Sequence, residues 1–368
     1  KKLNGKKHYL ISSVCISKNG SMIWNHTDKA ELTMKKMTDE DLNDYLSKIS
    51  DENLYAYNVY QIEGEGRKLF SKIEGDENTI MGLPIKKIKE YLNNYKWQTD
   101  NFIMKKYLVI GNPIEHSLSP QLHNFWIKEN NIKADYNKRK INKDEIKSLI
   151  LNVRDKKING LNVTVPYKKE IINHLDELTH EANKTQSVNT VFLDGDKVTG
   201  HNTDISGFEL AIKEIDFDIK DKQILILGAG GVVPSIIFAL YKMEARKVSV
   251  MNRTRSKTEN LKNLFKEIVV LDWGEIPDCD MIINATSVGL KKEDKINLDF
   301  SKISKNKLFY DIIYNPKKTN FLKTGSDLGN KTENGKMMFI YQAIAAFKIW
   351  HGLEPKINND VIKLLEEW

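Results

Sequence analysis

The sequence has few cysteines and no long hydrophobic run. Cys15 and Cys279 are the two cysteines among 368 residues, and they lie far apart without the spacing of a metal site. We therefore expect neither a disulfide framework nor a bound metal, and a reducing cytoplasm fits this cysteine usage. The longest apolar stretches, such as FIYQAIAAFKIW at 339–350, are shorter than the roughly 20 residues of a membrane helix and contain Gln and Lys. No membrane partner is expected.

A concentrated basic segment is also missing. The net charge of +7 comes from lysines scattered along the whole sequence, which argues against a nucleic-acid partner but suits anionic small molecules. Hydrophobic residues make up 40% and charged residues 29% of the chain, as in ordinary soluble globular proteins. The length suffices for two or three domains. We expect a small-molecule substrate as the partner, and a homodimer is left open.

Strands alternate with helices from about residue 104 onward, which predicts βαβ units, an α/β fold and a mainly parallel sheet. The expected strands cover 106–111, 134–141, 160–166, 223–227, 247–252, 281–287 and 308–314. The expected helices cover 119–131, 143–154, 168–178, 205–215 and 336–352. Before residue 104 the sequence predicts strands at 8–18 and 69–75 and helices at 38–49 and 83–95, the first capped by Thr38.

One predicted strand is followed directly by a lysine. The run LNVTVPYKKE at 161–170 alternates apolar residues, and Pro166 closes the strand because proline cannot donate to a ladder. Lys168 then lies at the C-terminal end of the strand, where ligands bind in open α/β sheets. The alternative is a solvated lysine in the first turn of a helix.

Further polar side chains fall at strand ends or helix starts. They are Ser117 and Ser119 in GNPIEHSLSP, Thr164 beside the lysine, Asn189 in SVNTV, and Asn202 and Asp204 in GHNTDISG. Ser119, before Pro120, and Asp204 could instead serve as helix N-caps. Capping and ligand binding are compatible, because both occur at helix N-termini on one edge of the sheet.

The stretch QILILGAGGVVPSIIFALYKM consists of an apolar strand, a glycine turn and an apolar helix, which is the setting of a dinucleotide-binding fingerprint. Gly228 permits the tight turn, and Gly230 lets the backbone approach a pyrophosphate on the N-terminal amides of the helix. At the end of the next strand, Asn252, Arg253, Thr254 and Arg255 stand where an NAD enzyme places an acid. Two guanidiniums beside a hydroxyl suit a 2′-phosphate, so NADP is favoured over NAD.

The segments GNPIEHSLSP, NVTVPYK, NTD, GAGG, NRT, NATSVG and YDIIYNP, with a late helix containing glutamine, resemble the shikimate dehydrogenase family in order and spacing. The resemblance covers residue 105 or so to the C-terminus. It implies a substrate-binding and catalytic domain at 104–204, completed by 342–368, and a Rossmann NADP-binding domain at 205–341. The implied reaction is the reversible, NADP-dependent reduction of 3-dehydroshikimate to shikimate, on the way to chorismate and the aromatic amino acids.

The same resemblance implies roles for individual residues. Lys168 and Asp204 form the catalytic pair. The substrate-binding residues are Ser117, Ser119, Thr164, Asn189, Tyr314 and Gln342. The NADP-binding residues are Gly228, Ala229, Gly230, Gly231, Asn252, Arg253, Thr254, Arg255, Asn284, Thr286, Ser287 and Gly335. Because ketone reduction builds negative charge on oxygen, Lys168 is the expected proton donor, with Asp204 orienting its ammonium.

The first hundred residues resemble the C-terminal half of the Maf family of nucleoside triphosphate pyrophosphatases, through YQIEG and GD…GLP. This implies a partial α+β Maf-like domain at 1–103, in which Glu63 and Asp76 are candidate contacts, with solvated loop acids as the alternative. Pyrophosphatase activity is not expected, because the family's N-terminal motifs have no counterpart before His8. Three functions stay open beside the main one: a quinate/shikimate dehydrogenase, a pyrophosphatase in the first domain, and a non-catalytic ligand sensor.

Overall fold

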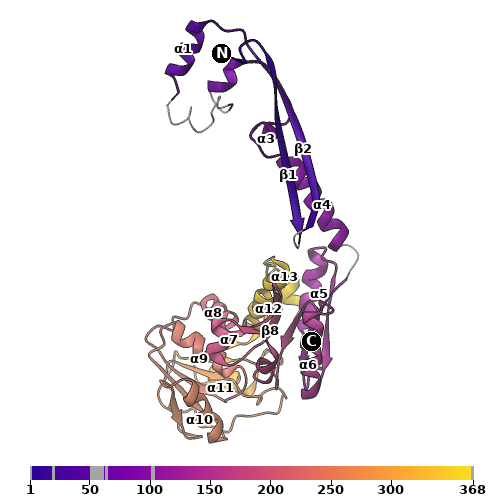
Figure 1. Cartoon of the computed structure of the whole chain (residues 1–368). Coiled ribbons are helices and arrows are strands. Elements are labelled where there is room, and N and C mark those ends of the chain that lie inside the picture. The colour runs from indigo at the N-terminus through magenta and orange to yellow at the C-terminus, as the bar shows by residue number, and fades with distance from the viewer. Residues whose placement is uncertain (1, 19–20, 50–61, 63–64, 101–103, 366–368) are drawn as a thin grey trace. The chain divides into compact units, whose positions relative to one another are not determined.

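The structure is a computed structural model of the chain, and it describes all residues except 1, 19–20, 50–61, 63–64, 101–103 and 366–368 (Figure 1). The chain divides into two compact units, Lys1–Ile103 and Met104–Trp368. In the described part of the chain, no helix is long and apolar enough to cross a membrane.

The first unit is built on a three-stranded antiparallel sheet of β1 (Lys7–Lys18), β2 (Ser21–Met34) and β3 (Phe70–Glu74). The sequence reading missed β2, which pairs with β1 along its whole length. The remaining elements are helical: α1 (Asp39–Ser47), η1 (Glu65–Leu69), α3 (Glu77–Ile80) and α4 (Ile85–Asp100). The unit buries a small core of Ala30, Leu32, Met34, Leu69 and Phe70.

Two polar residues of the first unit act as helix caps. Thr38 forms a capping box with Asp41 at the start of α1, as predicted. Asp76 accepts a hydrogen bond from the backbone N–H of Asn78 at 2.9 Å and so caps α3. The other candidate contact of this unit, Glu63, lies outside the described residues. The carboxylate of Asp76 thus has a structural role.

The second unit begins with a six-stranded sheet, called sheet I, in the order β5-β4-β6-β8-β9-β7. Its strands are β4 (Lys105–Gly111), β5 (Ala134–Lys140), β6 (Gly160–Val163), β7 (Glu177–Leu178), β8 (Thr190–Asp194) and β9 (Lys197–His201). Sheet I is mainly parallel, as predicted, but β8 runs antiparallel to both β6 and β9. Gly195, with a φ of 61°, makes the tight turn between β8 and β9.

The helical segments beside sheet I are α5 (Ser119–Glu129), η2 (Lys143–Glu145), α6 (Ile146–Arg154), η3 (Glu170–His174) and α7 (His180–Thr185). The predicted helix over 168–178 is wrong, since η3 is a short 3-10 turn that ends at an extended Leu175. Asp176 exchanges hydrogen bonds with Val198 at 2.9 and 2.7 Å, and this pairing draws the chain into β7. Local helical propensity is overridden by pairing with the neighbouring strand.

The second sheet, called sheet II, is parallel throughout in the order β12-β11-β10-β13-β14-β15, as predicted for this half. Its strands are β10 (Gln223–Leu227), β11 (Lys247–Met251), β12 (Val269–Leu271), β13 (Met281–Asn284), β14 (Leu308–Asp311) and β15 (Lys331–Asn334). The helices of this half are α8 (Asp204–Glu214), α9 (Val233–Lys242), α10 (Arg255–Leu264) and α11 (Asn320–Asp327).

The chain then returns to sheet I through α12 (Lys336–His351) and α13 (Asn359–Leu364), which Figure 1 shows beside α5. α12 is apolar nearly all round and packs closely on α8. Gly207 makes this approach possible, because a Cβ there would lie 2.9 Å from the Cβ of Gln342. The start of α8 and the middle of α12 are therefore held side by side.

His123 of α5 is fully buried in a cluster of aromatic rings. Its ring stacks on Tyr136 with centroids 4.2 Å apart. Neither ring nitrogen has a hydrogen-bond partner within the described residues. Burial, together with a smaller contribution from the charge of His351, lowers the pKa of His123 to about 3. The imidazole is therefore neutral in the folded protein near neutral pH.

We predict that His123 makes the second unit sensitive to acid. An unfolded histidine titrates near pH 6.5, so between there and a pH of about 3 only the unfolded state binds this proton. The free energy of unfolding then falls by about 1.4 kcal/mol for each pH unit of acidification. His123→Phe keeps the stacked ring and should flatten the pH dependence of denaturant unfolding. The control His116→Phe, at an exposed position, should keep the parent slope, and equal slopes in both variants would contradict the prediction.

Candidate active site

Lys168 and Asp204 form a largely buried ion pair. The Nζ of Lys168 lies 2.5 Å from Oδ2 of Asp204, and the two side chains are 12% and 9% exposed. Lys168 follows β6, and Asp204 is the first residue of α8. The alternative explanation of Lys168 as a solvated lysine is therefore wrong.

Asn189 holds the carboxylate of Asp204 from the other side. Its Nδ2 donates to Oδ1 of Asp204 at 2.8 Å and to Oγ1 of Thr203 at 2.9 Å, while its Oδ1 accepts from the backbone N–H of Thr203. The backbone N–H of Val188 donates to the carbonyl of Lys168 at 2.9 Å. Both oxygens of Asp204 are thus satisfied, and the loop that carries Asn189 is tied to the loop that carries Lys168.

Neither candidate N-cap has that role. The N-cap of α8 is Thr203 and that of α5 is Leu118, so the capping alternatives for Asp204 and Ser119 are wrong. Asn202 instead anchors the start of α8 from within the core. Its Nδ2 donates to Oγ of Ser235 at 2.9 Å and to the carbonyl of Ser187 at 3.0 Å, and its Oδ1 accepts from the N–H of Asp204. The carboxylate of Asp204 is left available for Lys168.

Ser117 and Ser119 lie in the loop after β4 and at the start of α5. The N–H of Ser119 donates to Oγ of Ser117 at 3.4 Å. Tyr314 lies in the loop after β14. Burial raises the pKa of its hydroxyl to about 12, and a hydrogen bond with the Leu118 backbone opposes that increase. Tyr314 also stacks on Phe339 of α12, with ring centroids 4.5 Å apart. The structure thus brings the two serines and Tyr314 to the same place.

Thr164 and Gln342 approach this region from β6 and α12. Thr164 follows β6, with its methyl group packed over Gly111. Gln342 donates to the carbonyl of Phe339 at 2.8 Å and packs against Gly207, one turn along α8 from Asp204. All six expected substrate ligands therefore lie near the strand ends and helix starts where Lys168 and Asp204 meet.

The glycine turn between β10 and α9 lies next to Lys168. Gly228 has a φ of 111°, and a Cβ there would lie 2.7 Å from the carbonyl oxygen of Ala285. The carbonyl of Gly231 accepts from Oγ of Ser187 at 3.1 Å, and a Cβ on Gly231 would lie 3.8 Å from Cδ of Lys168. A dinucleotide on this turn would therefore reach the ammonium of Lys168.

The structure separates the two arginines that follow β11. Arg255 is paired with Asp272 and with Glu259, the latter at 3.2 Å. Arg253 is exposed and has no ion pair within the described residues. Asn252 donates to the carbonyl of Thr254 at 2.9 Å and so shapes the loop. Of the two guanidiniums, that of Arg253 is the one left available for a phosphate.

The loop after β13 depends on a carboxylate that the sequence reading missed. Asp311 is fully buried, and burial raises its pKa to about 6. It accepts from Asn284 at 3.1 Å and from Thr319 at 2.6 Å, while Asn284 accepts from the N–H of Thr286 at 3.1 Å. This network fixes Asn284, Thr286 and the adjoining Ser287. An acid at the end of a buried strand, in LFYD, was the signal for it.

Gly335 completes this side of the site as the N-cap of α12. A Cβ there would lie 2.1 Å from the carbonyl oxygen of Ile312, so only glycine fits. Within the described residues, no group of three or more His, Cys, Asp and Glu side chains could hold a metal ion.

Comparisons with known proteins agree with this geometry. A model of the shikimate dehydrogenase substrate binding domain matches residues 109–191, and a model of shikimate / quinate 5-dehydrogenase matches residues 209–317. The shikimate dehydrogenase (NADP(+)) of Pelagibacter ubique is 55% identical over 262 residues, which are 71% of this chain and 99% of that protein. The chain belongs to the shikimate dehydrogenase family.

Other members of the shikimate dehydrogenase family give the same result. The protein of Caldicellulosiruptor saccharolyticus is 37% identical and covers 72% of this chain and 98% of its own length. The crystal structure of shikimate dehydrogenase from Aquifex aeolicus matches with a TM-score of 0.64 and 37% identity, over 72% of this chain and 97% of that one. The Thermus thermophilus enzyme, solved with NADP(H) and shikimate, matches with a TM-score of 0.65 and 30% identity, over 72% of this chain and 98% of that one. A model of Maf-like protein matches residues 1–95.

We predict that Gly228→Ala destabilises the second unit. The substitution puts a Cβ into a backbone with φ of 111° and against the Ala285 carbonyl, which should cost about 1–3 kcal/mol of unfolding free energy. Gly230→Ala is the matched control, because its nearest contact would be at an ordinary 3.8 Å. Denaturant unfolding should show parental stability for Gly230→Ala, and equal stability of both variants would contradict the prediction.

Proposed function

We propose that the chain is an NADP-dependent shikimate dehydrogenase, which reversibly reduces 3-dehydroshikimate to shikimate in the biosynthesis of chorismate and aromatic amino acids. The observation that carries this proposal is the buried Lys168–Asp204 pair beside the glycine turn. The relatives named shikimate dehydrogenase (NADP(+)) support it. A preference for quinate is not favoured by any contact in the described part of the chain.

The described residues fit a bound NADP. The Gly228 turn can accept a pyrophosphate at the N-terminus of α9. Arg253, which has no ion pair within the described residues, offers a guanidinium for a 2′-phosphate at the end of β11. We assign the groups Gly228 to Gly231, Asn252 to Thr254, Asn284 to Ser287 and Gly335 to this cofactor. When bound there, NADPH would supply the hydride for reduction of the ketone, and NADP+ would accept a hydride in the reverse direction.

Lys168 handles the proton. As a hydride reaches the ketone carbon, negative charge grows on the oxygen, and an ammonium in a nearly dry site stabilises that charge and donates its proton. The Asp204 carboxylate, 2.5 Å from Nζ, keeps Lys168 in one orientation. In the reverse direction, the neutral amine of Lys168 takes the proton of the alcohol.

We further assign Ser117, Ser119, Thr164, Tyr314 and Gln342 to the substrate. Hydroxyl and amide groups suit a polyhydroxylated ring with one carboxylate. Asn189 remains a proposed substrate ligand, although its amide already donates to Asp204 and Thr203. Apart from Tyr314, which comes from the loop after β14, these groups lie on 104–204 and α12, which supports a substrate domain of 104–204 with 342–368 and a nucleotide domain of 205–341. The free thiols of Cys15 and Cys279 suit a reducing cytoplasm.

The direct test follows absorbance of NADPH when the purified chain is mixed with NADP+ and shikimate. We expect NADP+ to be reduced when shikimate is the substrate. The reaction should be slower when NAD+ replaces NADP+ or when quinate replaces shikimate. Failure to reduce NADP+ with shikimate, by protein shown to be folded, would refute the proposal. Faster turnover of quinate would replace it by the quinate alternative.

We predict that Lys168→Ala lowers kcat by two orders of magnitude or more. A hundredfold decrease corresponds to a loss of about 2.7 kcal/mol of transition-state stabilisation. The KM for shikimate should change less. The reason is that the proton is donated chiefly in the transition state. Lys169→Ala, at the neighbouring exposed position, serves as control and should retain parental kinetics. Parental turnover in Lys168→Ala would remove the lysine from the mechanism.

We also predict different roles for the two arginines. Arg253→Gln should raise the KM for NADP+ at least tenfold and leave that for NAD+ nearly unchanged, because a charged hydrogen bond to the 2′-phosphate contributes about 1.5–3 kcal/mol. Arg255→Gln should have a smaller effect, since that guanidinium is paired with Asp272 and Glu259. Equal losses of NADP+ affinity in both variants would contradict the distinction.

A further inference from the structure

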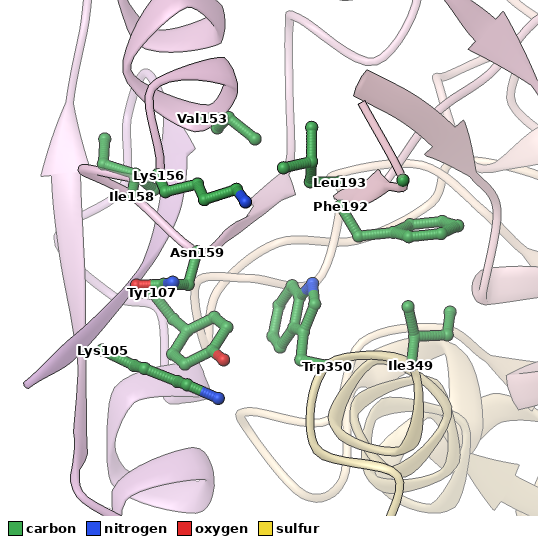
Figure 2. Close-up of a pocket in the computed structure, with 11 residues that line it drawn as sticks. Lys105, Tyr107, Val153, Lys156, Ile158, Asn159, Phe192, Leu193, Ile349 and Trp350 are labelled. Atoms are coloured by element: carbon green, nitrogen blue, oxygen red, sulfur yellow. The ribbon is translucent and has the colours of Figure 1, made fainter. Parts of the chain in front are cut away.

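A hollow that does not include Lys168 or Asp204 lies in the part of the second unit that holds sheet I. It has a cavity volume of about 300 Å³, near the lower end for small-molecule sites. Figure 2 shows its walls, which come from the start of β4, the end of α6, the end of β8 and the end of α12. The aromatic side chains of Tyr107, Phe192 and Trp350 line it together with Lys105, Lys156 and Asn159.

The hollow is separate from the proposed active site. β4 and β6 run parallel, with Tyr107 opposite Gly160 at their N-terminal ends, and the hollow lies at that edge. Lys168 follows the C-terminal end of β6. The two sites therefore lie at opposite ends of the strands β4 and β6. The roles proposed for Lys168 and Asp204 give the hollow no function.

The aromatic wall is held rigidly. The indole Nε1 of Trp350 donates to the carbonyl of Val191 at 3.2 Å, and the indole lies so close to Gly160 that a Cβ there would be 2.3 Å from Nε1. The rings of Tyr107 and Trp350 have centroids 5.0 Å apart. Because Tyr107 is only 2% exposed and packs on Trp350, the indole of Trp350 is the fixed aromatic surface left for a flat ring, and little side-chain freedom is lost when such a ring binds.

The polar part of the wall carries positive charge. Neither Lys105 nor Lys156 has a side-chain hydrogen bond or ion pair with another described residue, and the residues that line the hollow include no Asp or Glu. Figure 2 shows the side chain of Lys156 extended into the space near Trp350 and Leu193. Asn159 accepts from the N–H of Lys106 at 2.9 Å, so its amide NH2 adds a neutral donor.

We propose that this hollow binds a small molecule that combines one flat ring with a carboxylate. The ring lies against Trp350, the carboxylate is held by the ammonium group of Lys156, and Lys105 adds a second positive charge at the rim of the hollow. Two cations without an ion-pair partner among the described residues, at the rim of a hollow with an aromatic wall, are complementary to such a ligand in both charge and shape.

The test is calorimetric titration of the full chain with benzoate. Saturating NADPH and shikimate are present, a pair that cannot react and that keeps the active site occupied. Benzoate should bind with a dissociation constant of about 1 mM or tighter, and benzamide, its uncharged analogue, at least tenfold more weakly. In the double variant Lys105→Gln/Lys156→Gln, benzoate affinity should fall at least tenfold.

The matched control is Lys128→Gln/Lys147→Gln, which removes two exposed lysines of α5 and α6 that do not line the hollow. It should keep parental affinity for benzoate, and both double variants should keep parental dehydrogenase turnover. Any of three results would overturn the proposal: no binding of benzoate to the parent, equal binding of benzamide, or equal loss of affinity in both double variants. Binding seen only without shikimate would place benzoate in the active site and would also overturn it.

Discussion

The site depends on the ion pair between Lys168 and Asp204. Two charges taken out of water are costly unless each has partners of good geometry. Asp204 meets this condition, because Lys168 binds one of its oxygens and Asn189 the other. Asn189 immediately precedes β8 and Lys168 follows β6, and these strands are antiparallel neighbours. The mixed order of sheet I is therefore what places the carboxylate's second partner beside the lysine.

Close backbone contacts then fix the pair relative to the second half of this unit. Gly207 lets α12 pack on α8, so the helix that begins with Asp204 carries Gln342 beside it. The hydrogen bond from Ser187 to Gly231 joins the Asn189 loop to the glycine turn. Because these contacts involve backbone atoms or buried side chains, they would hold a nucleotide on the turn and a substrate near Asp204 in one geometry. This is the positioning that hydride transfer demands.

Much of the second unit's fold and of its candidate site could be predicted from the sequence, because strand ends and the glycine turn are marked by local sequence patterns. Lys168, Asp204 and Gly228 each follow or begin an element that its own residues specify. What failed was set by distant residues: the helix expected over 168–178 gave way to pairing of Asp176 with Val198. The role of Arg255 at a phosphate stays a prediction, and the sequence did not show that its guanidinium also pairs with Asp272, on a segment that no local pattern connects to it. The hairpin of β8 and β9 did have a signal, the two-residue Gly-Asp turn of Gly195 and Asp196 between two short strand-forming runs.

The Maf-like first unit has a structural role for the one described acid that was expected to contact a ligand. It has its own small core, and the one acid of its expected contacts that the structure describes, Asp76, caps a helix. Cleavage of a nucleoside triphosphate with a divalent metal needs carboxylates free to bind the cation, and a capping carboxylate is already engaged. Every side chain assigned to the proposed dehydrogenase reaction lies in Met104–Trp368, the unit that the Pelagibacter ubique relative matches over 99% of its own length. The proposed dehydrogenase reaction therefore needs no side chain from the described part of the first unit.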